Sequence, residues 1–332
     1  MKKIKSKINI FFNTIVILMI FSLLGCQKSN EKRFSQEKFL FGTYIQMIIY
    51  SDNEKQANEI MKKAFSEIER IDNKFNSKNK NSIIYSLNES DKKIVKIDSE
   101  GKYIFDEVRK MYEVTEKVYD ITVGPLLDLW GFGKEERKNV PSELEIKEVL
   151  KNIDFSKVEI IDDNLIVNGK ETIDTGSFLK GYALEKAKEI LINNGVKNGF
   201  ISSVSSIVTI GEKIDGSPWK IGLQDPNNQE KRLGVVEIKN KSMGVSGDYQ
   251  TYIEIDGKRY HHIMNKFTGY PIADKKMVAV ICDSGFMADI YSTSFFGMKD
   301  NKILEFCEKN NVDVFIVKSD NSIIKTKNFN LK

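Results

Sequence analysis

The sequence predicts an α+β fold, with mainly antiparallel sheets and packed helices in a single large domain. Segments with the apolar spacing of helices are interleaved with short segments in which apolar and polar residues alternate. Two alternating segments flank Asp256-Gly257, a dipeptide typical of two-residue β-hairpins. Hairpins alongside helices are typical of the α+β class. The chain contains neither Gly-x-Gly-x-x-Gly nor Gly-x-x-x-x-Gly-Lys-Ser/Thr, so both common nucleotide-binding loops are missing from the sequence.

Residues 1–25 are expected to be a secretory signal peptide. A basic start precedes an apolar run over residues 8–24, which ends in Leu23-Leu24-Gly25-Cys26. The basic residues are Lys2, Lys3, Lys5 and Lys7. The Leu-Leu-Gly-Cys sequence resembles a bacterial lipobox, which implies that Cys26 is lipidated. The protein is then expected to be extracytoplasmic and held at the cell membrane through its lipid alone; a single-pass N-terminal anchor is the alternative.

Residues 26–38 are expected to form a polar tether, because they contain few apolar side chains to bury, and residues 39–332 the folded domain. The net charge of +4 is carried by the four signal-peptide lysines, so the mature chain is neutral. A neutral chain offers no basic surface for nucleic acid. After Cys26 only Cys282 and Cys307 remain; we expect buried thiols, and a disulfide between them stays open.

Four segments have the apolar spacing of amphipathic helices. They are residues 53–75, 103–118, 141–153 and 178–193. The third begins with proline, which is favoured at the first helical position, and the fourth ends at Asn194-Gly195, a typical C-cap.

Strands are predicted where apolar residues alternate with polar ones or form short runs between turn residues. The predicted strands are residues 40–50, 157–161, 164–167, 199–210, 219–223, 234–238, 251–255, 258–264 and 276–282.

The two histidines of the chain, His261 and His262, are adjacent on a predicted strand. Neighbouring residues of a strand face opposite sides, so one histidine is expected to point into the fold or a site. Histidine is the usual proton acceptor near neutral pH. A pair of ordinary sheet histidines is the alternative, and the local sequence alone favours it.

Two further groups of oxygen-bearing side chains are candidates for a site. Asp174-Thr175-Gly176-Ser177 directly precedes a predicted helix, where such residues most often form a cap but where free N–H groups also bind phosphate. Asp289 and Thr293 are four residues apart, so a helical segment would place both on one face. Oxygen ligands of this kind suit a hard cation that keeps some of its waters or binds phosphate. Each group alone is weak evidence.

Five segments follow one another in the chain: Phe41-Gly42-Thr43, residues 119–133, residues 174–183, residues 246–249 with the following hairpin to residue 271, and Ala288-Asp289 with Ser292-Thr293. In this order they resemble the ApbE family, the FAD:protein FMN transferases, from about residue 40 to residue 297. The Leu-Trp-Gly-Phe-Gly sequence at 129–133 and the Lys-Gly-Tyr-Ala sequence at 180–183 are the most specific. The resemblance implies an ApbE/T-fold-like architecture.

The resemblance also implies roles for individual residues. Mg²⁺ would be bound by Asp289, by Thr293 and by the residue aligned with the family's third ligand position, Ser177. His262 would be the catalytic base, and His261 would stay structural. FAD contacts would fall at Phe41, Lys78, Val118, Tyr119, Asp120, Asp174, Lys180 and Met264.

The implied reaction transfers FMN from FAD to a Thr or Ser hydroxyl of an exported or membrane redox protein and releases AMP. Mg²⁺ would neutralise the diphosphate, Lys180 would add positive potential, and His262 would take the hydroxyl proton. Two alternatives use the same site: an Mg²⁺-dependent FAD pyrophosphatase, in which water is the nucleophile, and a non-catalytic FAD-binding lipoprotein.

Several residues of this chain differ from the usual family residues. Phe41 replaces Met, Lys78 stands where an aromatic residue is frequent, Ser205-Ser206 replaces Gly-Gly, and Asn265-Lys266 replaces Asp-Pro. The serines are expected to narrow the flavin pocket, because a side chain replaces hydrogen. Replacing the family's Asp by Asn265 loses a carboxylate, which would remove an acceptor if that carboxylate orients a group or faces the metal in the family.

Overall fold

The computed structural model describes residues 31–133 and 137–332, so the predicted signal peptide and Cys26 lie outside the described residues. An eight-stranded sheet forms the centre of the fold, in the order β1-β2-β6-β7-β10-β13-β14-β15, and every neighbouring pair is antiparallel. The strands are β1 (Lys32–Leu40), β2 (Thr43–Ser51), β6 (Gly199–Ser203), β7 (Ser206–Ile210), β10 (Ser242–Gly247), β13 (Lys275–Cys282), β14 (Asp313–Lys318) and β15 (Ile323–Lys325).

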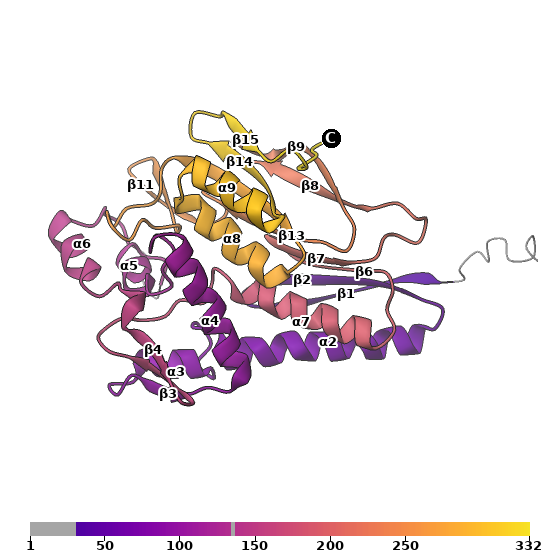
Figure 1. Ribbon diagram of the computed structural model, residues 1–332, viewed down its shortest axis with the longest axis horizontal. Coiled ribbons are helices and arrows are strands. Elements are labelled where there is room, and N and C mark those ends of the chain that lie inside the picture. The colour runs from indigo at the N-terminus through magenta and orange to yellow at the C-terminus, as the bar shows by residue number, and fades with distance from the viewer. Residues whose placement is uncertain (1–30, 134–136) are drawn as a thin grey trace, which may run out of the picture.

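Helices cover one face of this sheet and a β-hairpin covers the other (Figure 1). The alternation in β13 shows both sides: Met277, Ala279 and Ile281 pack with the hairpin β8 (Trp219–Asp225) and β9 (Asn228–Ile238). Val278, Val280 and Cys282 pack with the helices α8 (Gly285–Gly297) and α9 (Asp300–Asn310). A strand buried on both faces has few polar residues for this reason.

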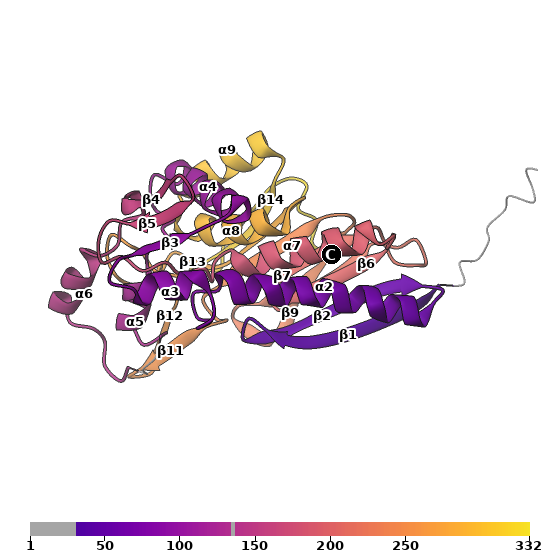
Figure 2. The same cartoon turned by 90° about the horizontal axis from the view of Figure 1, so that it is seen from below.

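The helices α2 (Glu54–Phe75) and α7 (Leu179–Asn193) lie side by side along the sheet (Figures 1 and 2). The buried residues of α2 repeat every three or four positions, as the sequence predicts, and Asn53 caps the first turn through its side chain. α7 ends at Asn193, with Asn194 at the C-cap and Gly195 at φ 86° after it, which confirms the predicted C-cap.

The remaining elements lie at one end of the sheet. They are the helices α3 (Ile83–Glu89), α4 (Ser99–Val114), α5 (Gly124–Leu129) and α6 (Glu143–Leu150), a short 3₁₀ turn (Phe155–Lys157), the three-stranded sheet of β3 (Ile94–Lys96), β5 (Asn164–Val167) and β4 (Val158–Ile161), and the hairpin of β11 (Tyr252–Ile255) and β12 (Lys258–His261). The predicted α+β class is confirmed, in one domain. Among the described residues, no helix combines the length and apolar character needed to span a bilayer.

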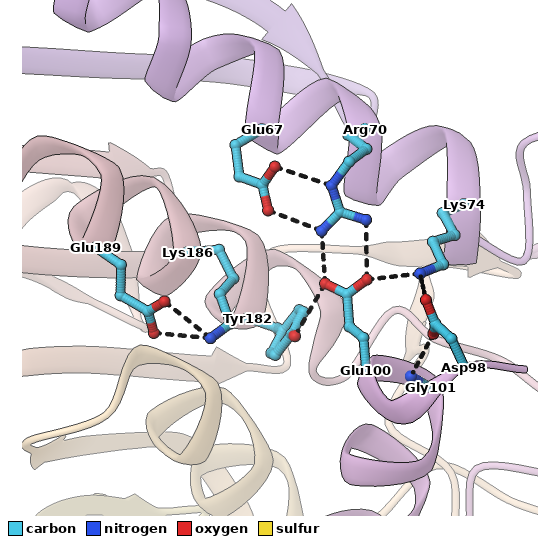
Figure 3. A network of polar contacts seen from close by, with 9 residues as sticks. All are labelled: Glu67, Arg70, Lys74, Asp98, Glu100, Gly101, Tyr182, Lys186 and Glu189. Carbon is cyan, nitrogen blue, oxygen red and sulfur yellow. Dashed lines mark hydrogen bonds and ion pairs between the residues drawn. The ribbon is translucent and has the colours of Figure 1, made fainter. Parts of the chain in front are cut away.

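A network of ion pairs and hydrogen bonds around the partly buried Glu100 joins α2, α4 and α7 (Figure 3). Glu100, in the first turn of α4, accepts two hydrogen bonds from Arg70, at 2.6 and 2.8 Å, and one from Lys74 at 2.7 Å. Tyr182 of α7 donates to the same carboxylate at 3.1 Å. Burial alone would raise the pKa of Glu100, but the bonds from Arg70 and Lys74 lower it to about 2.

The structure corrects the predicted tether. Residues 32–38 belong to β1, which pairs with β2 from Lys32↔Ser51 to Leu40↔Thr43. Phe34 is the only apolar residue among residues 32–38, but the backbone of the segment pairs with β2, so low apolar content did not prevent strand formation. The ordered domain therefore starts before residue 39.

The strand predicted over residues 40–50 is confirmed from Thr43 onward as β2, but its start is wrong, because Phe41-Gly42, with positive φ of 54° and 71°, form the turn that connects β1 to β2. The strand predicted over residues 199–210 is broken by Val204-Ser205, with Val204 at φ 42°. Phe and Val are uncommon at positive φ, so the first residue of each turn gave no signal for it.

Some predicted boundaries were wrong by a few residues. The helix predicted from Pro141 begins at Glu143, because Ser142 and Glu145 form a capping box. α4 begins at Ser99, behind the N-cap Asp98, rather than at Tyr103. Cys282 and Cys307 are both buried free thiols, as expected.

Candidate active site

A cavity of about 650 Å³ opens where the β1–β2 turn, the loop before α5, the start of α7, the β6–β7 turn, β10, the segment after β12 and α8 meet. Its size is typical of small-molecule sites. The structure brings together in its lining every predicted catalytic, FAD-contacting and metal-binding residue. These are Phe41, Lys78, Val118, Tyr119, Asp120, Asp174, Ser177, Lys180, His262, Met264, Asp289 and Thr293.

Asp289 lies on α8 and is buried. Its Oδ2 accepts hydrogen bonds from the backbone N–H of Gly181, at 2.7 Å, and from Oγ of Ser206, at 2.8 Å. Burial raises the pKa of Asp289 to about 6, against the opposing effects of Lys180 and these hydrogen bonds. A cation in the cavity would stabilise the charged form of this carboxylate.

Gly181 allows α7 and α8 to approach closely enough for this contact. A Cβ at this position would lie 2.2 Å from the carbonyl oxygen of Gly285 and 2.8 Å from Cγ of Asp289. No larger residue fits without movement of the helices.

Hydroxyl groups cluster around the part of α8 that lines the cavity. Asp289 and Thr293 are on one helix, as the i, i+4 spacing requires for a shared face. Oγ of Ser246 lies 2.9 Å from Oγ of Ser292 and 3.1 Å from Oγ1 of Thr293. This set offers only oxygen atoms, which fits a hard cation rather than a thiolate- or imidazole-bound metal.

Within residues 31–133 and 137–332, no group of three or more His, Cys, Asp or Glu side chains could hold a metal ion. A cation here would depend on Asp289 together with hydroxyl and backbone oxygens, and on the phosphates of a ligand. Mg²⁺ is often bound in this way, through one or two carboxylates plus substrate phosphates.

The Asp174 turn does not cap α7 with a side chain. Oδ1 of Asp174 accepts from the N–H of Gly176 at 2.8 Å, within its own turn, and the first turn of α7 has no side-chain cap. The Ser177 hydroxyl lies 2.9 Å from the Tyr119 hydroxyl. Burial raises the pKa of Tyr119, so this group stays neutral. Lys180 lies in the first turn of α7 and lines the same cavity.

The two histidines occupy different environments. His261 is buried; its Nε2 lies 2.8 Å from the carbonyl oxygen of Ile272, and burial lowers its pKa to about 4. His262 is half-buried and lines the cavity. Its Nδ1 lies 3.1 Å from the carbonyl oxygen of Thr251.

The Thr251 contact fixes the tautomer of His262. A carbonyl oxygen only accepts, so Nδ1 carries the proton and Nε2 of the neutral ring is left as an acceptor. Burial lowers the pKa of His262 and outweighs the opposing effect of the Thr251 bond; the charge of Lys180 lowers it further. A neutral imidazole is the form required of a general base.

Asp120 lines the cavity, but both of its carboxylate oxygens are bound inside the protein. Oδ1 accepts from the N–H of Thr122 at 2.8 Å and from its hydroxyl at 2.6 Å. Oδ2 accepts from the N–H of Phe155 at 3.2 Å and from Nζ of Lys266 at 2.6 Å. The side chain of Asp120 therefore holds the cavity wall in place.

The residues that differ from the family pattern have structural explanations. Ser205 lines the cavity, whereas Ser206 is buried and bonds to Asp289. Asn265 caps the following turn by accepting from the N–H groups of Phe267 and Thr268. Its side chain thus orders the turn after His262 and lies outside the cavity lining.

Sequence reasoning missed several residues of the site. Ser206 was noted only for its bulk, although it supplies a donor to Asp289. Ser246 was placed in a hairpin motif without a role, and the carbonyl of Thr251 has no side-chain signal at all.

The sequence model of the ApbE family matches residues 41–316. The chain is 29% identical over 326 residues to the FAD:protein FMN transferase of Haemophilus influenzae, covering 93% of each chain. It is 25% identical to the FAD:protein FMN transferase of Vibrio cholerae, covering 92% of this chain and 93% of that one.

Among solved structures, the fold is similar to an ApbE protein from Thermotoga maritima, with a TM-score of 0.82 at 28% identity, covering 89% of this chain and 97% of the other. The flavin transferase ApbE from Vibrio cholerae shares the fold at 23% identity, with a TM-score of 0.77 over 89% of this chain and 97% of that one. With the family match spanning most of its length, this chain belongs to the ApbE family.

Proposed function

We propose that this protein is an FAD:protein FMN transferase, which moves FMN from FAD onto a Thr or Ser hydroxyl of an acceptor protein and releases AMP. One observation carries the proposal: a single cavity collects the Asp289 oxygen cluster, Lys180 and the free Nε2 of His262. Phosphoryl transfer needs this combination of charge neutralisation, positioning and a proton acceptor. The similar proteins of Haemophilus influenzae and Vibrio cholerae bear the name of this activity.

His262 is the proposed base. Its neutral Nε2 accepts the proton of the acceptor hydroxyl while the hydroxyl oxygen attacks the FMN phosphorus. The bond between the FMN phosphorus and the bridging oxygen of the diphosphate breaks, and AMP leaves with that oxygen and the electron pair. The Thr251 carbonyl holds the ring through Nδ1 and stabilises the imidazolium that forms.

Asp289, Thr293 and Ser177 are the proposed ligands of Mg²⁺. The fit rests on the buried carboxylate, whose pKa is raised by burial, and on a donor set made only of oxygen. When bound, Mg²⁺ would neutralise the diphosphate and stabilise the AMP leaving group. Lys180 adds positive charge to the same end of the cavity, and Lys78 also lines it.

The cellular placement is part of the proposal. The lipobox-like sequence ending at Cys26 supports an extracytoplasmic protein anchored to the membrane by lipid. The acceptor would then be an exported protein or the exposed part of a membrane protein, with a Thr or Ser that can enter the cavity.

The test uses residues 27–332 with FAD, MgCl₂ and a fragment of an exported redox subunit that carries a Thr-containing segment. Transfer predicts AMP release together with an acceptor whose mass increases by one FMN unit. AMP and free FMN without any acceptor would show a pyrophosphatase instead. Retained FAD with no AMP would show a binding protein and would overturn the proposal.

The matched pair of variants for this assay is Asp289→Asn and Asp283→Asn. Both remove one carboxylate charge, but Asp283 is an exposed residue paired with Lys241, outside the cavity lining. We expect Asp289→Asn to abolish AMP release and Asp283→Asn to leave it unchanged.

A further inference from the structure

Lys266 and Asp120 form a buried ion pair between two walls of the cavity. Nζ of Lys266 lies 2.6 Å from Oδ2 of Asp120, and the side chains are 9% and 0% exposed. Ion pairs at a protein surface contribute little, because water screens both charges. Here Asp120 is fully buried and Lys266 nearly so, so water screens the charges little. Loss of either partner would therefore leave the other charge buried and uncompensated.

The Asp120 end of the pair fixes the loop that carries the cavity residues 118–123. Its carboxylate holds the N–H and hydroxyl of Thr122 and the N–H of Phe155. One residue later, the carbonyl of Ile121 accepts from the N–H of Asp174 at 2.7 Å. The loop and the Asp174 turn therefore form one connected wall.

The Lys266 end fixes the opposite wall. Lys266 follows His262 by four residues and Met264 by two, and both of those residues line the cavity. Nζ of Lys266 also lies 5.0 Å from the centre of the Tyr112 ring. A cation over an aromatic face is attracted to it, which further limits where the ammonium group can lie.

We propose that Lys266 is a positioning residue, which holds the His262–Met264 segment in register with the 118–123 loop through Asp120. This inference rests on the proposed function, since it concerns how the same cavity binds FAD and aligns the base. Lys266 itself does not line the cavity, so it acts only through the groups it holds.

The physical basis is preorganisation. A misplacement of about 1 Å in a reacting group can reduce the rate about a hundredfold. Removing one partner of a buried pair leaves the other charge without compensation, so the wall that carries it must move or admit water. Removing both charges relieves this penalty, and the double variant is then expected to be closer to the wild type than either single variant.

The experiment compares wild type, Lys266→Met, Asp120→Asn and the double variant in the mature chain with MgCl₂. Lys302→Met serves as the matched control, because Lys302 is exposed on α9 and its pair with Glu305 spans 3.8 Å. FAD dissociation constants come from calorimetric titration, and kcat is measured at saturating FAD. Circular dichroism gives the unfolding midpoint, so that all titrations are made well below it.

We expect the FAD dissociation constant of Lys266→Met to rise at least about tenfold, and that of the double variant to return to within about threefold of the wild type. A merely structural lysine would shift the unfolding midpoint without changing FAD affinity in the folded protein. Equal FAD affinity in wild type and Lys266→Met would overturn the inference, as would strictly additive effects in the double variant.

If Lys266→Met does not fold, the comparison of Asp120→Asn with the double variant decides: tighter FAD binding by the double variant supports the pair, and equal or weaker binding overturns it. Failure of the wild type to bind FAD would instead overturn the proposed function. The two failures are thus distinguishable.

Discussion

The backbone N–H of Gly181 donates to the carboxylate of Asp289 across 2.7 Å, although the two residues are 108 positions apart. The bond joins the first turn of α7, which carries Lys180, to α8, which carries Thr293. Lys180 and the Thr293 hydroxyl therefore keep fixed relative positions as long as the two helices stay in contact.

Gly181→Ala is expected to destabilise the protein by about 1–3 kcal/mol, because the added methyl group overlaps Gly285 and Asp289 and the helices must separate. Urea denaturation measures this loss. Glu189→Ala, on the half-exposed side of α7, should change the free energy of unfolding by less than about 0.5 kcal/mol. Equal stability of Gly181→Ala and wild type would show that the helix contact is looser than the structure indicates.

His262→Gln is expected to lower the rate of FMN transfer about 10²- to 10⁴-fold, because the proton acceptor is lost, while FAD binding changes little. Single-turnover measurement of AMP release at saturating FAD tests the rate, and calorimetric titration tests the binding. A large loss of FAD affinity with unchanged single-turnover rate would assign His262 to binding rather than to proton transfer.

The pH dependence follows from the lowered pKa of His262. Burial moves this pKa below 6.5, so the neutral, proton-accepting ring is the main form at pH 7 and above. We expect kcat to stay constant as the pH falls to 7 and to decrease only below pH 6.5. A decrease centred above pH 7 in the wild type would contradict this assignment.

Chelation of Mg²⁺ is expected to abolish AMP release, and added MgCl₂ should restore it, because the diphosphate charge would otherwise repel the incoming hydroxyl. Titration with Mn²⁺, followed by electron paramagnetic resonance, measures the affinity of the site directly in the presence of FAD. Asp289→Asn should weaken this affinity at least about tenfold. Full activity in excess chelator would remove the metal from the mechanism.

Glu100 provides a stability prediction independent of the cavity. Its folded-state pKa of about 2 lies below the ordinary value of 4.5, so its contribution is fully present above pH 4.5 and is lost as the pH falls towards 2. Its partner Arg70 is 41% exposed, and screening limits the contribution to about 1–2 kcal/mol. Urea denaturation between pH 6 and pH 3 should show a smaller loss of stability in Glu100→Gln than in wild type; parallel curves would exclude the effect.

Local sequence signals determined much of this fold. The spacing of apolar residues located α2 and α7, and Asp256-Gly257 located the β11–β12 hairpin, because these patterns depend on neighbours a few positions away. The turns at Phe41-Gly42 and Val204-Ser205 were missed for the same reason: each begins with a residue, Phe41 or Val204, whose positive φ is imposed by strand pairing and not favoured by its side chain.

The sequence by itself also located much of the candidate site, since every residue that the family resemblance assigned to it lies in the lining of one cavity, although the roles of Ser206 and Ser246 were missed. Only the tertiary structure decided what each group does there. It shows that Lys266 donates to Asp120 and that Gly181 and Ser206 donate to Asp289. It also shows that Nδ1 of His262 contacts the carbonyl of Thr251. Each of these contacts joins separate elements of the chain, and hydrogen bonds are selected by distance and burial in the folded molecule, which the local sequence pattern does not specify.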